Sequence, residues 1–225
     1  MDMGCWTEQE TFSQQADSSG WQGKCIAADG HKFEVFFKGQ SQGMLDWGLI
    51  GQHNIENAVM AIAAARHVGV TPVNAIEALT QFSPPKRRME LLATPNNIAV
   101  YDDFAHHPTA IETTLKGLRA KVGNGKIIVV LEPRSNTMKS GVHKDTLACS
   151  MALANEAWLY QASNVGWNIA DNMRSATIPV TVSDDISHIV TKVSQAAHPG
   201  DTIVVMSNGG FNGIHQQIIQ ALLSQ

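Results

Sequence analysis

Hydrophobic and polar residues alternate along residues 22–50, a pattern that is typical of short antiparallel strands. Within it, KFEVFF (32–37) predicts a strand, and the ADG that precedes it is a turn signal. The period changes in HNIENAVMAIAAARHVGV (53–70), where apolar residues recur at helical spacing. Thr71 and Pro72 then supply an N-cap and a first helical residue for a second helix. This part of the chain is predicted to be a small α+β unit.

Two consecutive prolines, Pro84 and Pro85, end the helical pattern and stiffen the chain. We therefore expect one domain over residues 1–83 and a second over residues 84–225. In the second domain, a hairpin and later strands are predicted in RMELLA (88–93), IAVYDDF (98–104), KIIVVLE (126–132), AWLYQ (157–161), PVTV (179–182) and TIVVMS (202–207). Helical patterns separate them over 108–121, 143–154, 167–174, 185–197 and from 212 onward. This alternation predicts an α/β fold, in which a mainly parallel sheet carries helices on both faces.

Three polar segments directly follow predicted strands of this sheet. They are DDFAHHP (102–108), EPRSNTMKSG (132–141) and NGGFNG (208–213). In doubly wound folds, ligands bind beyond the carboxyl ends of the strands. The segments are far apart in the sequence, but we expect the fold to bring them to one edge of the sheet.

The first of these segments has an unusually high density of ionisable side chains. A helix N-terminus explains His107 as the N-cap and Pro108 as the first helical residue. It leaves Asp102, Asp103 and His106 unexplained. A mixed cluster of aspartate and histidine is typical of metal sites. Holding a ribose and orienting a substrate carboxylate is the other interpretation.

The second and third segments carry groups that suit anions. Arg134 and Lys139 lie among hydroxyl and amide groups in EPRSNTMKSG, and the planar guanidinium of Arg134 matches a carboxylate. A solvated loop before a helix has the same composition. The glycine-rich SNGGFNGIH (207–215) exposes backbone N–H groups that suit an anion. It lacks the lysine of GxxxxGK[ST] and the spacing of GxGxxG, and the chain contains no Walker A motif.

Two further groups of residues precede this sheet. Asn54 and Asn57 are spaced i, i+3 at the start of a predicted helix and share a face. Capping explains Asn54 alone, whereas a carboxamide pair also suits the edge of a purine. Lys86, Arg87 and Arg88 form a cationic cluster beside the prolines. The cluster is either a solvated charge run or part of a ligand cleft between two domains.

Composition narrows the functional classes. The 225 residues are 44% hydrophobic, and the net charge of −4 argues against a nucleic-acid partner held by bulk electrostatics. The cysteines, Cys5, Cys25 and Cys149, are far apart and predict neither a disulfide framework nor a zinc site. No signal peptide and no membrane-spanning stretch is found in the sequence. The chain is therefore predicted to act in the cytoplasm without a membrane partner.

Five segments together resemble the Mur ligase family: GQHNIENAVMAIAAARHVGV, KRRMEL, YDDFAHHPTAI, VLEPRSNTMKSG and VMSNGGFNGIH. The resemblance is to the C-terminal half of such a ligase and covers nearly the whole chain. It implies that residues 1–83 are the tail of a central ATPase domain and that residues 84–225 are a C-terminal Rossmann-like domain. The family's P-loop, its Mg²⁺-binding acids and its domain for a UDP-sugar would then precede this chain, which is expected to be a fragment.

The resemblance also implies roles for individual residues. His53, Asn54 and Asn57 fall in the segment that holds adenine, Arg88 matches the arginine that reaches the ATP phosphates, and Asp103 matches the aspartate that holds the ribose. The implied substrate-binding residues are His106, His107, Arg134, Ser135, Asn136, Lys139, Asn208, Gly209 and Gly210. No catalytic residue and no metal ligand is assigned within the chain.

The implied reaction is ATP-dependent amide formation through an acyl phosphate, in bacterial cell-wall recycling. Its substrates are UDP-N-acetylmuramate and the murein tripeptide L-alanyl-γ-D-glutamyl-meso-diaminopimelate, and its cofactors are ATP and Mg²⁺. A chain without the P-loop is expected to bind without turnover. Two alternatives stay open: a metal-dependent phosphoesterase that uses the Asp/His cluster, and a non-catalytic domain that binds a peptide or a nucleotide.

Overall fold

The computed structural model describes residues 6–7, 9–13 and 20–225, so Cys5 lies outside the described residues. The chain divides into two compact units, Met1–Pro84 and Pro85–Gln225, at the two consecutive prolines. The division lies one residue beyond the domain boundary predicted from the sequence. No helix in the described part of the chain is long and apolar enough to span a membrane.

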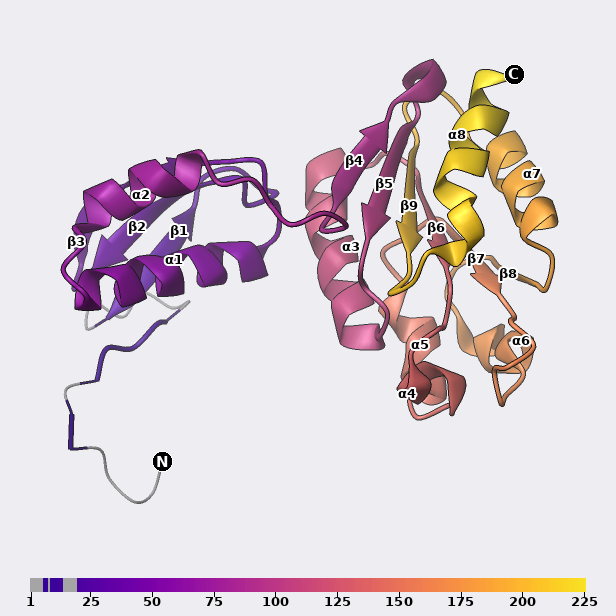
Figure 1. Ribbon diagram of the computed structural model, residues 1–225, viewed down its shortest axis with the longest axis horizontal. Helices are drawn as coiled ribbons and strands as arrows, with labels where there is room; N and C mark the ends of the chain where they lie inside the picture. The colour runs from indigo at the N-terminus through magenta and orange to yellow at the C-terminus, as the bar shows by residue number, and fades with distance from the viewer. Residues whose placement is uncertain (1–5, 8, 14–19) are drawn as a thin grey trace. The chain divides into compact units, whose positions relative to one another are not determined.

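The first unit is a three-stranded antiparallel sheet with two helices packed against it (Figure 1). The strands are β1 (Trp21–Cys25), β2 (Lys32–Phe37) and β3 (Gln40–Asp46), paired in that order. The helices are α1 (Gln52–His67) and α2 (Pro72–Thr80). Alternate strand residues and one stripe of each helix share a core, which includes Trp21, Phe33, Val35, Leu45, Ile55, Ile62 and Ile76.

The helices of this unit begin at local sequence signals, one of which was misassigned. Thr71 caps α2 as predicted, since its hydroxyl accepts a hydrogen bond from the N–H of Asn74 at 3.4 Å. In contrast, α1 begins at Gln52, and its N-cap is Gly51 with φ of 94°. The capping role considered for Asn54 is therefore wrong, because the helix has started before that residue.

The second unit is built on a six-stranded sheet in the order β4-β5-β9-β6-β7-β8. Its strands are β4 (Glu90–Ala93), β5 (Ala99–Asp103), β6 (Ile127–Leu131), β7 (Glu156–Tyr160), β8 (Val180–Ser183) and β9 (Thr202–Met206). β4 pairs antiparallel with β5, as the predicted hairpin requires, and the other pairings are parallel. The predicted α/β fold with a mainly parallel sheet is confirmed.

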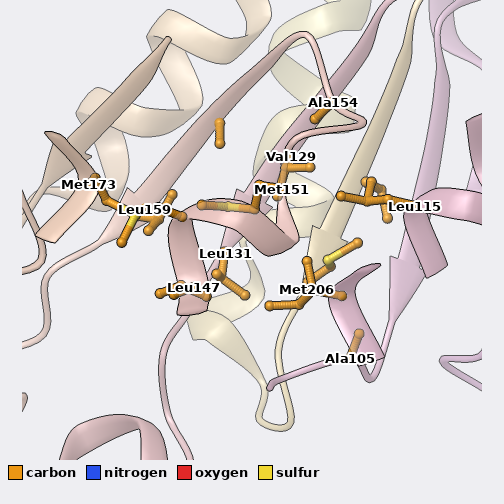
Figure 2. Close-up of a cluster of buried hydrophobic side chains, with 14 of the residues drawn as sticks. Ala105, Leu115, Val129, Leu131, Leu147, Met151, Ala154, Leu159, Met173 and Met206 are labelled. Carbon is orange, nitrogen blue, oxygen red and sulfur yellow. The ribbon is translucent and has the colours of Figure 1, made fainter. Parts of the chain in front are cut away.

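Helices cover both faces of this sheet (Figure 1). One face carries α3 (Pro108–Val122), α4 (Asn136–Lys139), α5 (Lys144–Ser150) and α6 (Ile169–Asn172), and the other carries α7 (Ile186–Ala196) and α8 (Ile214–Leu223). Because successive strand residues point to opposite faces, Val129 belongs to the first core and Val130 to the second. Figure 2 shows the first core, in which Leu131 and Met206 from the strands gather with Leu115 from α3.

The strand order determines which loops meet. β5, β9 and β6 are neighbours, so their carboxyl ends lie side by side at one edge of the sheet. The three polar segments that follow these strands are thereby brought together, as predicted. Short 3₁₀ helices complete the unit. The sequence pattern did not predict η1 (Pro95–Asn97), whereas η2 (Met173–Ser175) and η3 (Phe211–Gly213) overlap the ends of predicted helices.

Candidate functional site at the sheet edge

The carboxyl ends of β5, β9 and β6 present Asp103, Ser207 and Glu132 next to one another. The N–H of Ser207 donates to the carbonyl oxygen of Asp103 at 3.2 Å, and the N–H of Glu132 donates to that of Met206 at 3.0 Å. All three side chains are buried, with 5%, 0% and 8% exposure respectively. Buried carboxyl groups are costly unless they are hydrogen-bonded. The hydrogen-bond partners of these side chains therefore show which groups are committed to the protein and which are left for a ligand.

Asp103 is held by hydrogen bonds within its own unit. Its Oδ1 accepts from the N–H of Ala105 at 2.8 Å and from the hydroxyl of Thr114 at 3.2 Å, and its Oδ2 accepts from the N–H of Met89 at 2.8 Å. Burial raises the pKa of Asp103, and these hydrogen bonds together with the charge of Arg88 oppose the rise. The Asp103 carboxyl group thus fixes both the loop after β5 and the turn before β4.

Replacing Asp103 by alanine is expected to lower the free energy of unfolding by about 2–4 kcal/mol, because the N–H groups of Met89 and Ala105 lose their acceptor. Urea unfolding of the 225-residue chain, followed by circular dichroism, measures the change. The control is Asp171→Ala, which removes an exposed ion pair to Arg174 and is expected to cost about 0.5 kcal/mol or less. Equal stability of the Asp103 variant and the wild-type chain would contradict this structural role.

Asp102 points to the opposite side of β5 and joins a separate polar group. Its Oδ2 accepts from Nε of Arg87 at 3.0 Å, and its Oδ1 lies 3.1 Å from Nε2 of His215. Burial alone would raise the pKa of Asp102, but the hydrogen bonds and charges of His215 and Arg87 hold it below its usual value. Arg87 also donates to the carbonyl oxygen of Ser207. The guanidinium of Arg87 is therefore committed to β5 and β9.

Left-handed residues flank Arg88 on both sides. The angle φ is 63° at Arg87 and 49° at Met89, a conformation that costs a non-glycine residue about 1–2 kcal/mol. Two hydrogen bonds hold it: the N–H of Arg87 donates to the Glu90 carboxylate at 2.8 Å, and the N–H of Phe104 donates to the carbonyl oxygen of Arg87 at 2.9 Å. Arg88 is exposed and makes no hydrogen bond or ion pair with the described residues, and its guanidinium lies over the ring of Phe104, 5.7 Å from the ring centroid. Unlike Arg87, it remains available to a ligand.

The two histidines after β5 lie edge to face, with their ring centroids 5.3 Å apart. Nδ1 of His106 lies 2.9 Å from the carbonyl oxygen of Phe104. His107 caps α3 as predicted, since its Nδ1 accepts from the N–H of Ala110 at 3.4 Å. Burial lowers the pKa of His107, and the charges of His106 and of His143, which was not predicted as a neighbour, lower it further. These effects favour the neutral ring that the cap requires.

The Asp/His cluster does not form a metal site. Asp102 and Asp103 point to opposite sides of β5, each carboxyl group has protein donors, and His107 caps a helix. Within the described ranges, no three histidine, cysteine, aspartate or glutamate side chains gather in a way that could hold a metal ion. The described residues therefore give no support to the phosphoesterase alternative.

Arg134 is anchored where β6 and β9 end. Its Nη1 lies 3.7 Å from Oε1 of Glu132, whose Oε2 accepts a hydrogen bond from the Ser207 hydroxyl at 2.5 Å. About half of the Arg134 side chain, 48%, remains exposed. Neither Glu132 nor Ser207 was predicted as a site residue. Glu132 could have been found, because a carboxylate directly after a buried apolar strand indicates a site residue.

The loop after β6 is more ordered than its polar composition predicts. It contains α4, which Ser135 caps by accepting a hydrogen bond from the N–H of Met138 at 3.3 Å. Met138 is fully buried in the first core, and its carbonyl oxygen accepts from the indole N–H of Trp167 at 2.7 Å. Ser135 thus has a structural role, whereas Asn136 is exposed and Lys139 is partly exposed.

The glycine-rich turn after β9 offers fewer free N–H groups than expected. The N–H of Gly209 donates to Oγ of Ser207 at 2.9 Å and is therefore not free to bind an anion. The buried amide oxygen of Asn208 lacks a hydrogen-bond partner among the described residues. Gly209 lies directly against Arg134, whereas a Cβ at Gly210 would meet nothing within 4 Å. The turn therefore supplies an acceptor that is free among the described residues, the amide oxygen of Asn208, and packs Gly209 against Arg134.

The residues expected to hold adenine lie in the first unit, at the start of α1. The side-chain N–H of Asn54 donates to the carbonyl oxygen of Ile50 at 2.8 Å, and Asn57 is exposed. Asn54 and Asn57 are one turn apart and share a face of the helix, as their spacing predicts. His53 precedes them on the same turn and is partly exposed.

Residues 87–209 match the family model of the Mur ligase glutamate ligase domain. The match covers more than half of the chain. The chain belongs to the Mur ligase family. Over 223 residues, this Mur ligase chain is 48% identical to the UDP-N-acetylmuramate–L-alanyl-γ-D-glutamyl-meso-2,6-diaminoheptandioate ligase of Escherichia coli (strain K12), covering 99% of this chain and 48% of that protein.

Solved Mur ligase structures show the same relationship. A murein peptide ligase mpl from Psychrobacter arcticus 273-4 is 40% identical with a TM-score of 0.69, covering 95% of this chain and 46% of that one. A domain from a putative UDP-N-acetylmuramate:L-alanyl-γ-D-glutamyl-meso-diaminopimelate ligase of Haemophilus ducreyi 35000HP is 42% identical with a TM-score of 0.52, covering 60% of this chain and 99% of that one. This chain thus spans about half the length of the Escherichia coli and Psychrobacter relatives.

Proposed function

We propose that this chain is the part of a bacterial cytoplasmic ligase that contacts the nucleotide and receives the amine substrate. The whole enzyme would join UDP-N-acetylmuramate to L-alanyl-γ-D-glutamyl-meso-diaminopimelate in an ATP-dependent reaction of cell-wall recycling. The observation that carries the proposal is the identity to the Escherichia coli ligase, which extends over nearly the whole chain. The sheet edge supports it, because it offers two available arginines, Arg88 and Arg134, on different loops.

Each of the two units, taken by itself, carries residues whose chemistry fits part of ATP. The carboxamides of Asn54 and Asn57 offer donors and acceptors, as the edge of adenine does. Arg88 supplies a cation for the phosphates. Asp103 already accepts three hydrogen bonds, so a ribose hydroxyl would be a further donor to the same carboxyl group. The described residues contain no ligand set that fits Mg²⁺, and we assign this part of the chain no role in holding it.

The peptide side of the proposed site lies at the ends of β6 and β9. The murein tripeptide carries several carboxylates, and the half-exposed guanidinium of Arg134 can bind one of them with two parallel hydrogen bonds. The unpaired amide oxygen of Asn208 can accept an N–H of the peptide. Lys139 lies on the same loop as Arg134 and His106 lies on the loop after β5, and both would add polar contacts. The arrangement therefore matches a ligand that presents both carboxylates and N–H groups.

The proposed reaction has two steps. The carboxylate of UDP-N-acetylmuramate attacks the γ-phosphate of ATP and yields an acyl phosphate and ADP. The α-amine of the tripeptide then attacks the acyl carbon, forms the amide bond and releases inorganic phosphate. The first step requires positioning and neutralisation of charge, to which Arg88 would contribute. The second requires the amine to be held close to the acyl carbon, which the loops after β5, β6 and β9 would do.

The 225-residue chain alone is expected to form no product and to hydrolyse no ATP above background, because its sequence contains no P-loop. A chimeric ligase, in which this chain replaces the matching half of the Escherichia coli relative, is expected to form the amide. ADP release and mass spectrometry of the UDP-linked product measure both, with the intact Escherichia coli ligase as the positive control.

Two results would contradict the proposal. Product formed by the chain alone would show that it holds its own phosphate-binding machinery. A chimeric ligase that joins L-alanine to the UDP-sugar and leaves the tripeptide unused would show that the amine substrate has been assigned wrongly.

A further inference from the structure

The turn after β9 leaves room for one particular side chain of the loop after β6. At Gly209, a Cβ atom would lie 2.4 Å from Cδ and Nε of Arg134 and 2.6 Å from its Cζ. A larger residue at position 209 would therefore displace the guanidinium. The backbone itself does not require glycine there, because φ of Gly209 lies outside the left-handed region. The missing side chain is explained by the close approach of Arg134.

The same turn holds the group that orients Arg134. Ser207 donates its hydroxyl proton to Oε2 of Glu132 at 2.5 Å and accepts the N–H of Gly209 at 2.9 Å. The other carboxylate oxygen of Glu132 lies 3.7 Å from Nη1 of Arg134. The arginine is thus held from two directions, by the backbone of Gly209 and by the carboxylate of Glu132.

We propose that Gly209 and Glu132 are positioning residues for Arg134, which they hold so that its remaining N–H groups face a carboxylate of the peptide substrate. The inference rests on the proposed function. An arginine that is already held in one orientation loses less conformational freedom when its ligand binds. In this proposal Gly209 acts through Arg134, which differs from the direct substrate contact that the family resemblance implied for it.

A packing role alone does not account for this arrangement. Arg134 keeps 48% of its side chain exposed, and Glu132 is its sole ion-pair or hydrogen-bond partner among the described residues. A guanidinium has five N–H groups, so most of those of Arg134 remain available. Arg119 of the same unit shows what a structural arginine does, since it donates to the carbonyl oxygens of Gly123, Gly125 and Leu153.

The first test locates the guanidinium without using activity. The Nε–H signal of Arg134 in a ¹H–¹⁵N spectrum of the 225-residue chain is assigned by its loss in Arg134→Ala. The signal is expected to shift or broaden in Gly209→Ala and in Glu132→Gln. It is expected to stay unchanged in Gly48→Ala, where an added Cβ meets nothing within 4 Å. An unchanged signal in both site variants would overturn the proposal.

The second test is a double-mutant cycle in the chimeric ligase. Gly209→Ala is expected to raise the KM for the tripeptide about tenfold and to leave the KM for ATP within about twofold. In an Arg134→Ala background the same substitution is expected to have no further effect, because Gly209 acts through Arg134. An equal effect of Gly209→Ala in both backgrounds would overturn the proposal, since general damage to the turn does not depend on Arg134.

The two tests separate this inference from the proposed function. If the chimeric ligase does not use the tripeptide while the Arg134 signal responds to Gly209→Ala, the positioning of Arg134 is supported and the proposed function fails. If the chimeric ligase uses the tripeptide and its KM is unaffected by Gly209→Ala and Glu132→Gln, the proposed function is supported and the positioning role is wrong.

Discussion

Replacing Arg88 by alanine in the chimeric ligase is expected to raise the KM for ATP roughly ten- to hundredfold. Arg88 is exposed, its guanidinium lies over the ring of Phe104, and it makes no hydrogen bond or ion pair with the described residues. The left-handed residues Arg87 and Met89 hold the backbone on both sides of it. A hydrogen bond between charged groups is worth about 1.5–3 kcal/mol, which sets the size of the effect. The KM for the tripeptide is expected to stay within about twofold, since the loss is confined to the nucleotide.

Two variants make the Arg88 measurement specific. Lys86→Ala removes an exposed cation from the same cluster and is expected to leave the KM for ATP within about twofold. Arg88→Lys keeps the charge but loses the planar guanidinium, so its KM is expected to lie between those of the wild-type chimeric ligase and Arg88→Ala. An equal rise in Lys86→Ala and Arg88→Ala would contradict a specific phosphate contact and would indicate a general electrostatic attraction instead.

For the three basic residues after the prolines, the sequence could not predict which of them is available to a ligand. Composition alone left open whether Lys86, Arg87 and Arg88 form a solvated run or a ligand site. The structure distinguishes the arginines, because Arg87 is committed to Asp102 and to the carbonyl oxygen of Ser207 while Arg88 is free of such partners among the described residues. Those partners lie in β5 and directly after β9, and no local pattern around residues 86–88 indicates them.

The fold of the second unit followed from the sequence because its signals are local. Alternation of strand and helix patterns was sufficient for a mainly parallel sheet, and the two adjacent strand patterns RMELLA and IAVYDDF were sufficient for the antiparallel hairpin of β4 and β5. The placement of three loops at one edge followed from the rule that ligands bind at the carboxyl ends of such strands. In the structure, the three loops meet because β9 is the neighbour of both β5 and β6.

The parts of the site that escaped prediction depend on contacts between distant residues. His215 lies in α8, and its pairing with Asp102 of β5 leaves no trace in the local pattern. In the sequence, Gly209 looks like an ordinary turn residue. Only the structure shows that the side chain of Arg134 packs directly against it. Met138 looks like an isolated apolar residue in a polar loop, yet it belongs to α4 and is fully buried in the first core. Tertiary packing decides each of these, and it also decides which polar groups are left for a ligand.

Asp103 illustrates why a site residue and a structural residue need different tests. Its carboxyl group accepts hydrogen bonds from Met89, Ala105 and Thr114, so a substitution there disturbs the segment that carries Arg88. A rise in the KM for ATP after Asp103→Ala would therefore not establish a contact with the ribose. Arg88 and Arg134 are better probes, because each is exposed and few protein contacts are lost with either side chain.

Replacing Arg134 is expected to damage the use of the peptide. Arg134→Lys is expected to raise the KM for the tripeptide about tenfold, because an ammonium group cannot form the two parallel hydrogen bonds that a guanidinium forms with a carboxylate. Arg134→Ala is expected to raise it about a hundredfold, since the whole charged contact is lost. The KM values for ATP and for UDP-N-acetylmuramate are expected to stay within about twofold.

Steady-state kinetics of the chimeric ligase, with one substrate varied at a time, measure these constants. Lys144→Ala is the matched control, because Lys144 is an exposed cation at the start of α5, and its removal is expected to leave the KM for the tripeptide within about twofold. Equal losses for all three substrates in Arg134→Ala would indicate that the loop after β6 is a structural connection. A loss confined to ATP would place Arg134 on the nucleotide side. A loss confined to the tripeptide, larger in alanine than in lysine, is the result that a carboxylate-binding arginine at the ends of β6 and β9 requires.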